Sequence, residues 1–394
     1  MRESDPAVAF LTDVLAGRGP LDLPGEARDR DRAVQLLRYH RLVGLWCAEN
    51  RDLGPNHPVG NHDPRWEGLE AEYLVTALHS ALVLESAKRA RQALSGAGIP
   101  SLTFKGAALL QDGTYPDTGA RSVEDSDLLV YRHAVGDGVR ALQEAGFEPW
   151  VEWDEGRVEW LPAFTFTDRN VPGVMDVSLD LHWCTPYSSF RSSADKIGED
   201  LWSGADLDEG LPAAEPHFLI LVEHFLKHLR VEAHLRGVGD LVRTLHGVSR
   251  PDVLVELAER RGSVRGLRMM LAFLRDMLGV LVPQELLSSA RVSAEPAFGR
   301  SSPMSPRRLV AVPGPERMGR VQGLMLQWSL TASPVSAIRE AWDVIVPPRR
   351  WLDGRYAEVS SRWGARRRRH LREVGAWLLG RGVSPLSPNQ EFEG

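Results

Sequence analysis

The spacing of hydrophobic and polar residues is helical towards both ends of the chain and changes in the middle. Near the N-terminus it predicts an amphipathic helix over residues 31–50 and a long helix over residues 66–95, which Gly96 and Gly98 should end. From about residue 216 onward the predicted helices are 217–230, 241–246, 253–261, 264–281 and 356–379. Residues 282–316, rich in Ser, Pro and Arg, are predicted to form a linker or an exposed loop.

Shorter apolar runs, separated by turn-forming residues, occupy the middle of the chain and are typical of strands. The predicted strands are 99–104, 123–130, 148–153, 158–166 and 174–184, with helices at 107–111 and 134–145 between them. The order of elements predicts an α+β fold, in which a mixed β-sheet is flanked by helices. We expect three regions: an N-terminal helical segment (1–95) packing on the core, the core itself (96–215), and a helical C-terminal region (216–394).

Two carboxylates stand at the start of the second predicted strand, in the sequence Arg-Ser-Val-Glu-Asp-Ser-Asp-Leu-Leu-Val from residue 121. Asp125 and Asp127 are two residues apart, so a strand places both side chains on the same side. Two like charges at this distance oppose each other's ionisation unless a cation lies between them. Mg²⁺, which proteins bind through one or two carboxylates together with substrate phosphates, suits such a pair.

The last predicted strand separates its residues equally clearly. Its apolar residues alternate with Asp176, Ser178, Asp180 and His182, which share one face. A half-buried strand commonly has a polar face, but a face made only of acid, hydroxyl and imidazole groups favours a functional site over a merely solvated one.

A lysine–glycine turn joins the first predicted strand to a helix. At Gly106 the backbone could approach a ligand closely, and the start of a helix favours phosphate. Lys105 would add a positive charge for phosphate oxygens. A surface lysine at a turn is the alternative interpretation.

Together, the order and spacing of these motifs are more specific than any one of them. The run Lys-Gly-x-x-Leu, then Tyr-Pro-Asp, then Arg-x-x-x-Asp-x-Asp-Leu-Leu-Val, then a strand ending Asp-Leu-His-Trp resembles the uncharacterised nucleotidyltransferase family. This family belongs to the DNA polymerase beta-like nucleotidyltransferase superfamily. The resemblance covers roughly residues 70–250 and extends through the helix histidines to Arg236 and Asp240.

This resemblance implies an activity and a metal site. Asp125, Asp127 and Asp180 would bind Mg²⁺, with Mn²⁺ as the alternative, and Asp176 is the substitute if the third ligand has shifted. The metal would hold the triphosphate of ATP or another NTP, while an acceptor attacks the α-phosphorus and pyrophosphate leaves. Asp180 or His182 would draw the proton from the acceptor.

Lys105, Gly106 and Arg121 are the candidate nucleotide-binding residues, since each could contact phosphate. Arg121 could instead form a structural ion pair. The superfamily usually has Gly-Ser or Gly-Gly where this chain has Lys105-Gly106, and a branched apolar residue where Ser126 stands. Ser126 should point into the core. Neither departure removes a carboxylate, so we expect an active enzyme.

Three further groups of residues have weaker signals. His224 and His228 share a helix face, which could suit zinc, but packing histidines are favoured because no third ligand accompanies them. His234 is expected, together with Arg236 and Asp240, to support the wall of the active site. The basic run 366–369, which continues to His370 and has tryptophans nearby, could bind RNA or an acidic peptide, although a solvated helix face is favoured.

Charge, cysteine content and the lengths of the apolar runs indicate where the protein works. The 394 residues have a net charge of −6, yet residues 300–394 hold 16 Arg and no Lys against 8 acidic residues, a local balance of +8. Cys47 and Cys184 form no metal-binding or disulfide motif, and no run of about 18 apolar residues is present. We therefore expect a cytoplasmic protein without membrane contact.

The leading hypothesis is Mg²⁺-dependent transfer of AMP from ATP to an unidentified small-molecule, peptide or protein acceptor. The alternative is a catalytically silent protein of the same fold that binds a nucleotide, a peptide or RNA. RNA as the acceptor is less favoured, because only the basic C-terminal third supports it.

Overall fold

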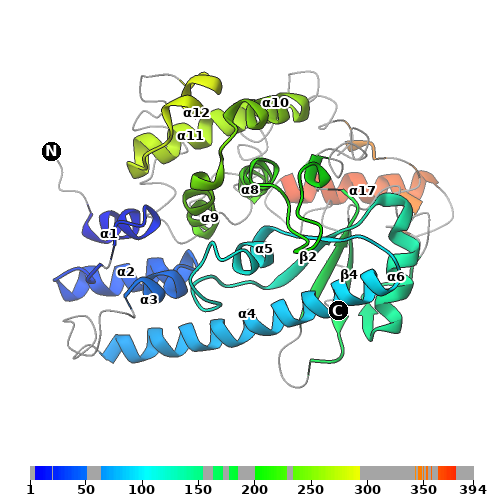
Figure 1. Ribbon diagram of the computed structural model, residues 1–394, viewed down its shortest axis with the longest axis horizontal. Helices are drawn as coiled ribbons and strands as arrows, with labels where there is room; N and C mark the ends of the chain where they lie inside the picture. The colour runs from blue at the N-terminus through cyan, green and yellow to red at the C-terminus, as the bar shows by residue number, and fades with distance from the viewer. Residues whose placement is uncertain are drawn as a thin grey trace.

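The computed structural model contains a mixed β-sheet with helices on both sides of it (Figure 1). The residues that it describes are 5–19, 21–50, 64–153, 163–171, 177–184, 200–228, 234–292 and 363–378, with isolated positions between 342 and 356.

Five strands form the sheet, in the order β1-β2-β5-β4-β3. Their bounds are Leu102–Phe104 (β1), Asp125–Leu129 (β2), Phe147–Pro149 (β3), Ala163–Asp168 (β4) and Ser178–His182 (β5). The central pair, β2 and β5, is parallel, and the other pairs are antiparallel. The predicted α+β class and mixed sheet are therefore confirmed, although β1, β2 and β3 are shorter than their hydrophobic runs suggested.

The two faces of β2 have different surroundings. Leu128 lies in a buried apolar cluster with side chains of the helices α4 (Pro64–Gly96) and α6 (Val135–Glu144). Ser126 lies on the same side of the strand as Leu128 and is fully buried, as predicted, and its Oγ has no hydrogen-bond partner among the described residues. Asp125 and Asp127 alternate with these residues and so face the opposite side of the sheet.

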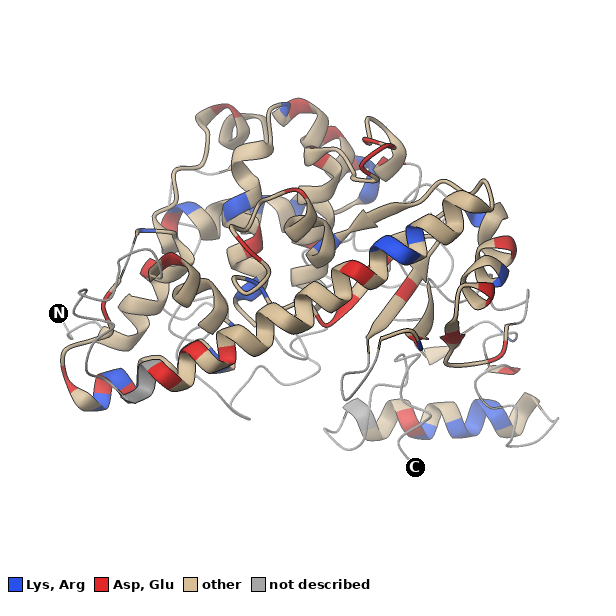
Figure 2. Cartoon of the chain, turned by 60° about the horizontal axis from the view of Figure 1, so that its bottom comes forward, with Lys and Arg blue, Asp and Glu red and all other residues tan. Residues whose placement is uncertain are grey.

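The long predicted helix is present as α4, which extends over 33 residues and packs against β2 and α6. Its charged residues form two groups separated by an uncharged middle (Figure 2). In the second group Arg89 forms an ion pair with Asp168, and Ser86 donates a hydrogen bond to the same carboxylate, at 2.6 Å. Gly98, with φ 72°, adopts the left-handed conformation that suits the end of a helix.

The prediction of one helix over residues 31–50 is wrong. Two helices, α2 (Ala27–Tyr39) and α3 (Val43–Asn50), occupy this region, and the chain breaks between them at Arg41, whose φ is 58°. The amide of Leu235 donates a hydrogen bond to the ring of His40, and the His40 carbonyl accepts one from the Arg236 amide at 3.3 Å. These contacts with a distant segment stabilise a break that the local pattern does not indicate.

One hydrophobic core joins the N-terminal helices to those that follow the sheet. It contains side chains from α1 (Pro6–Leu15), α2 and α3 together with side chains from α8 to α12. The later helices are α8 (Ala214–His228), α9 (Arg236–Thr244), α10 (Pro251–Arg261), α11 (Val264–Leu278) and α12 (Gln284–Ser289). Within the predicted linker, residues 284–289 are helical, because Leu286 and Leu287 are buried in this core.

The basic run lies on α17 (Trp363–Leu378), where its positive charges are visible in Figure 2. Arg366 contacts Asp353 at 2.6 Å and Arg369 contacts Glu373 at 3.0 Å, so two of its arginines form ion pairs. Among the described helices, none has the length and apolar composition that crossing a bilayer requires. The division into three regions stays a prediction.

Candidate active site

The acidic residues of the two central strands meet on one face of the sheet. Asp125 and Asp127 belong to β2, Asp180 and His182 to β5, and the parallel register places Asp127 directly opposite Asp180. Neighbouring residues in register share a face of the sheet, so the carboxylates converge across the two strands. Asp176 lies outside the described residues.

Three of these side chains form a compact cluster. His182 Nε2 lies 2.8 Å from Asp127 Oδ1 and 3.9 Å from Asp180 Oδ2. Thr165, opposite Asp180 on β4, donates a hydrogen bond of 2.6 Å to the other oxygen of that carboxylate. One ligand atom from each of Asp127, Asp180 and His182 falls within 4.8 Å of the others, the one such group found in the described part of the chain.

Lys105 reaches into this cluster from the start of the helix α5 (Lys105–Gln111). Its ammonium forms an ion pair with Asp127 Oδ1, and both side chains are almost completely buried. Burial would lower the pKa of Lys105, but attraction by Asp127, Asp125 and Asp180 outweighs it and raises this pKa. Burial opposes ionisation of Asp127 in turn, yet Lys105 and His182 hold its pKa well below the usual range.

Asp125 responds in the opposite direction. Burial, followed by repulsion from Asp127 and Asp180, raises its pKa to about 7, although Lys105 and Arg236 partly offset the rise. One carboxylate of the pair is therefore firmly ionised and the other is half protonated near neutral pH. The repulsion expected between the two aspartates is present in the folded chain.

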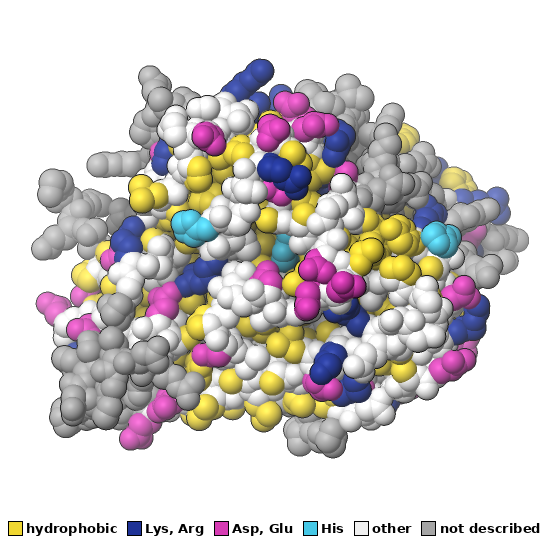
Figure 3. All heavy atoms as spheres, in the orientation of Figure 1, with side chains coloured by type: hydrophobic (Ala, Val, Ile, Leu, Met, Phe, Trp, Pro, Cys, Tyr) yellow, Lys and Arg dark blue, Asp and Glu magenta, His cyan; other side chains and the backbone are white. Residues whose placement is uncertain are grey.

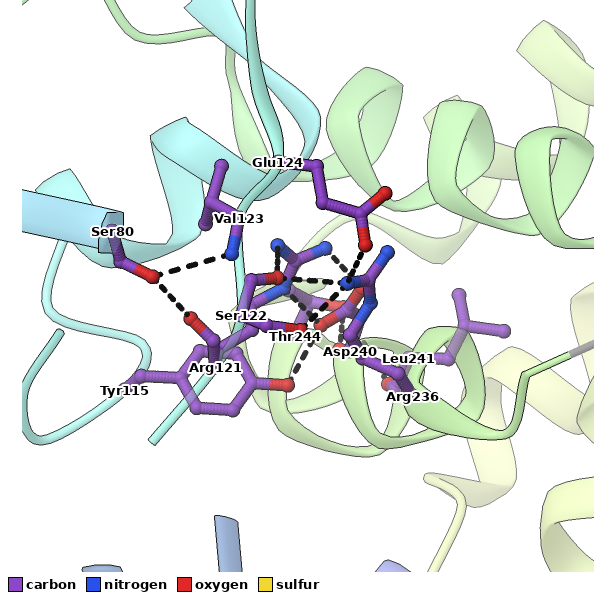
Figure 4. Close-up of polar contacts among 10 residues, drawn as sticks. All are labelled: Ser80, Tyr115, Arg121, Ser122, Val123, Glu124, Arg236, Asp240, Leu241 and Thr244. Atoms are coloured by element: carbon purple, nitrogen blue, oxygen red, sulfur yellow. Dashed lines mark hydrogen bonds and ion pairs between the residues drawn. The ribbon is translucent and has the colours of Figure 1, made fainter. Parts of the chain in front are cut away.

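Arg121 is committed to a buried ion pair. Its guanidinium donates to both oxygens of Asp240 on α9, at 2.7 and 2.8 Å, and the Tyr115 hydroxyl donates to the same carboxylate at 2.7 Å (Figure 4). The guanidinium lies over Gly106, where a Cβ atom would be only 2.1 Å from Arg121 Nη1. Gly106 is thus required for this close approach.

A second arginine, Arg236 at the start of α9, lies beside the segment that leads into β2. Arg236 donates to the carbonyl and the hydroxyl of Ser122, at 2.9 and 2.8 Å, and its Nη1 is 4.0 Å from Glu124 (Figure 4). Glu124 also forms an ion pair with Arg41. Burial lowers the pKa of Arg236 to about 10, and the charges of Arg121 and Arg41 add to this effect.

The sequence motifs did not reveal every residue around the site. Arg41 lies in the break between α2 and α3, and its contact with Glu124 depends on that break, so the local pattern gives no sign of it. His217 on α8 is buried and hydrogen-bonds the backbone of Lys105. Burial lowers its pKa to about 4. Its helical position was predicted, but its role was not.

The histidines with weaker sequence signals make packing or backbone contacts. The rings of His224 and His228 contact each other, with centroids 4.5 Å apart, and neither belongs to a group of three metal ligands in the described residues. His234 Nδ1 lies 2.7 Å from the carbonyl of Tyr39. The face shown in Figure 3 mixes acidic, basic and hydrophobic side chains, without one broad basic surface among the residues described there.

The cluster has the composition of a site for a hard divalent cation. Carboxylate oxygens are the preferred ligands of Mg²⁺, and Mn²⁺ accepts carboxylate and imidazole. Asp125 adds a fourth group whose ionisation a cation would promote, because the cation would offset the repulsion that raises its pKa. The residues present therefore fit a metal site.

A family model described as uncharacterised nucleotidyltransferase matches residues 26–279 of the chain. This stretch contains the whole sheet and the cluster. No curated protein and no solved structure matches the chain.

Proposed function

The chain belongs to the uncharacterised nucleotidyltransferase family, and from that premise we propose that it moves AMP from ATP onto an acceptor in a Mg²⁺-dependent reaction. The observation that carries the proposal is the convergence of Asp127, Asp180 and His182, with Asp125 beside them, on one face of the sheet. The acceptor is a small molecule, a peptide or a protein side chain.

In this proposal Asp125, Asp127 and Asp180 hold the divalent cation, and His182 supports Asp127. The bound cation would offset the negative charge that builds up on the transferred phosphoryl group and on the leaving pyrophosphate. Asp127 is suited to this position, because its low pKa keeps it ionised at any physiological pH.

The transfer step exchanges one phosphorus–oxygen bond for another bond to phosphorus. The acceptor oxygen or nitrogen attacks the α-phosphorus, the bond to the bridging oxygen of pyrophosphate breaks, and the acceptor proton passes to Asp180 or His182. Asp180 is the nearer to solvent, with 21% of its side chain exposed against 3% for His182. This favours Asp180 as the base, with Thr165 orienting its carboxylate.

Binding of the triphosphate needs cations next to the carboxylates. Lys105, Gly106 and Arg121 stay our candidates, with Lys105 and Arg121 engaged by Asp127 and Asp240 respectively. We add Arg236 to them, because it lies close enough to lower the pKa of Asp125 and its side chain is 22% exposed.

The decisive experiment incubates the protein with each labelled NTP, Mg²⁺ and a panel of acceptors, and measures pyrophosphate release. Asp125→Asn and Asp127→Asn should each reduce release by about 100-fold or more, because each removes a charge that the transition state requires. Asp137→Asn, in an exposed ion pair on α6, is the matched control and should behave as wild type.

If folded Asp125→Asn and Asp127→Asn variants released pyrophosphate at the wild-type rate, the assignment would be wrong. ATP that raised the melting temperature to the same extent with and without Mg²⁺, with no release, would indicate the silent nucleotide-binding alternative instead.

A further inference from the structure

Lys105 places a positive charge inside the carboxylate cluster. Its ammonium is paired with Asp127, lies 5.0 Å from the centroid of the Phe104 ring and is 12% exposed as a side chain. The ion pair uses Asp127 Oδ1, the oxygen that also contacts His182 Nε2. Lys105 therefore occupies the position of a cation bound to Asp127, and Oδ2 of the same carboxylate makes neither contact.

The backbone around Lys105 is arranged to hold this position. Lys105 has φ 55°, a left-handed conformation that costs free energy for any residue with a Cβ and that glycine adopts more easily. Gly106 follows beneath the Arg121 guanidinium, which Asp240 fixes, and His217 hydrogen-bonds the Lys105 backbone. Such strain persists where the surroundings over-determine it, typically at functional sites.

The charges of the cluster then limit how many metal ions it can hold. Even with Asp125, Asp127 and Asp180 all ionised, the Lys105 ammonium leaves them at most two negative charges, so a single divalent cation is enough to neutralise the group. Phosphoryl-transfer sites hold either one or two such cations. A second one would leave the cluster with a net positive charge in a largely buried place, which is unfavourable before the substrate arrives.

We propose that Lys105 is a built-in cation that takes the place of one metal ion, so that this site binds a single divalent cation through Asp125, Asp127 and Asp180, with His182 supporting Asp127. This inference rests on the proposed function, since it concerns the same site. In this proposal the Lys105 ammonium offsets part of the negative charge of the carboxylates. Its fixed position makes it part of the catalytic centre.

The test counts bound Mn²⁺ by electron paramagnetic resonance in titrations of the full-length protein. We expect one Mn²⁺ per wild-type chain and a second, weaker one only in Lys105→Met, because methionine has a similar length and no charge, so one positive charge less opposes the second ion. Lys88→Met, which removes an exposed lysine on α4, is the control and should bind one. Two ions in wild type, or one in both wild type and Lys105→Met, would overturn the inference.

The outcomes separate this inference from the proposed function. Two Mn²⁺ ions in wild type, with pyrophosphate release intact, would remove the role of Lys105 and leave the activity standing. No Mn²⁺ bound to wild type would contradict the metal-dependent function itself.

Stability provides a second measurement in case Lys105→Met is poorly folded. Without Lys105, Asp127 loses a buried partner, and Mn²⁺ should replace it. Saturating Mn²⁺ should therefore raise the melting temperature of Lys105→Met more than that of wild type. Equal increases in the two proteins would count against a cation position at Lys105.

Discussion

Asp125 and Asp127 are chemically unequal although they occupy equivalent positions on one strand. Lys105 contacts Asp127 and holds its pKa low, whereas burial and the neighbouring carboxylates raise the pKa of Asp125 to about 7. Asp125 therefore ionises near pH 7 in the folded state and near pH 4 in the unfolded state. Between these two values the folded and unfolded states bind different numbers of protons.

The sign of the resulting pH dependence follows from this difference. Between about pH 4 and pH 7 the folded state binds more protons at Asp125 than the unfolded state. The contribution of Asp125 to the free energy of unfolding therefore falls as pH rises through this window, and it is constant above it. Asp125→Asn cannot ionise and should not show the fall.

We therefore predict that Asp125→Asn is more stable than wild type at pH 8, in the absence of divalent cations, by about 1–4 kcal/mol. Urea denaturation at pH 5 and pH 8 with a chelator present measures it, and the two proteins should differ less at pH 5. A variant that is less stable than wild type at pH 8 would mean that Asp125 makes favourable contacts that outweigh the repulsion.

For single residues, the sequence predicted on which face of a strand a side chain lies, but not which distant residues it contacts. Alternation along a strand is a local property, so it was enough to predict that Asp125 and Asp127 share a face and that Ser126 points into the core. The contacts of Arg121 with Asp240 and of Lys105 with Asp127 join residues 119 and 22 positions apart. Local spacing does not determine such contacts.

Among the secondary-structure elements, α9 holds the segment that leads into β2. Asp240 accepts hydrogen bonds from Arg121 and Tyr115, and Arg236 binds Ser122, so two positions on one helix hold Arg121 and Ser122 in the segment before Asp125. Both partners of the central ion pair are almost completely buried. Their geometry is bidentate, which suits a rigid connection between elements.

Asp240→Asn should therefore destabilise the protein by about 3–5 kcal/mol, because it leaves the Arg121 charge buried without its counter-ion. Chemical denaturation measures the change. Asp137→Asn in the exposed pair on α6 serves as the comparison and should change stability by less than about 0.5 kcal/mol. Equal effects in the two variants would show that the buried pair contributes no more than a surface pair.

Gly106→Ala tests the contact between α5 and the same ion pair. The new Cβ would lie 2.1 Å from Arg121 Nη1 and 2.8 Å from its Cζ, so the guanidinium must move away from Asp240. We expect lower stability and lower pyrophosphate release. Gly96→Ala at the end of α4, where no atom lies within 4 Å of the new Cβ, should leave both unchanged. Normal release by folded Gly106→Ala would show that the Arg121 position is unimportant for the site.

The ends of helices were predictable where the sequence contains a residue, such as glycine, that ends helices. Glycines end the long helix α4 close to the predicted position, but no such residue marks the break between α2 and α3. There Arg41 adopts a left-handed backbone, and His40 accepts hydrogen bonds from the amides of residues 235 and 236. Tertiary contacts override the helical spacing at this point, and that spacing alone gave the wrong element.

For the molecule as a whole, the question is how the helices at the start of the chain relate to the sheet. The matched family segment begins at residue 26, after α1. Yet α1 contributes five buried residues, Ala7, Phe10, Leu11, Val14 and Leu15, to the core that also contains α8 to α11. Just after α1, Arg18 donates a 2.6 Å hydrogen bond to the carbonyl of Leu278 at the end of α11.

This arrangement predicts that α1 stabilises the part of the molecule that includes α9, and with it the entry to β2. Leu11→Ala should cost about 2–5 kcal/mol of folding free energy, since Leu11 is fully buried and its loss leaves a cavity. Leu281→Ala is the same substitution at a site that is 88% exposed, and it should cost little. If α1 and the sheet unfold together, the lower stability of Leu11→Ala appears as a shift of one unfolding transition. Urea denaturation measures this shift, with pyrophosphate release as a second probe. Loss of helix signal at low urea, with release unaffected until a later transition, would show instead that α1 unfolds independently of the active site.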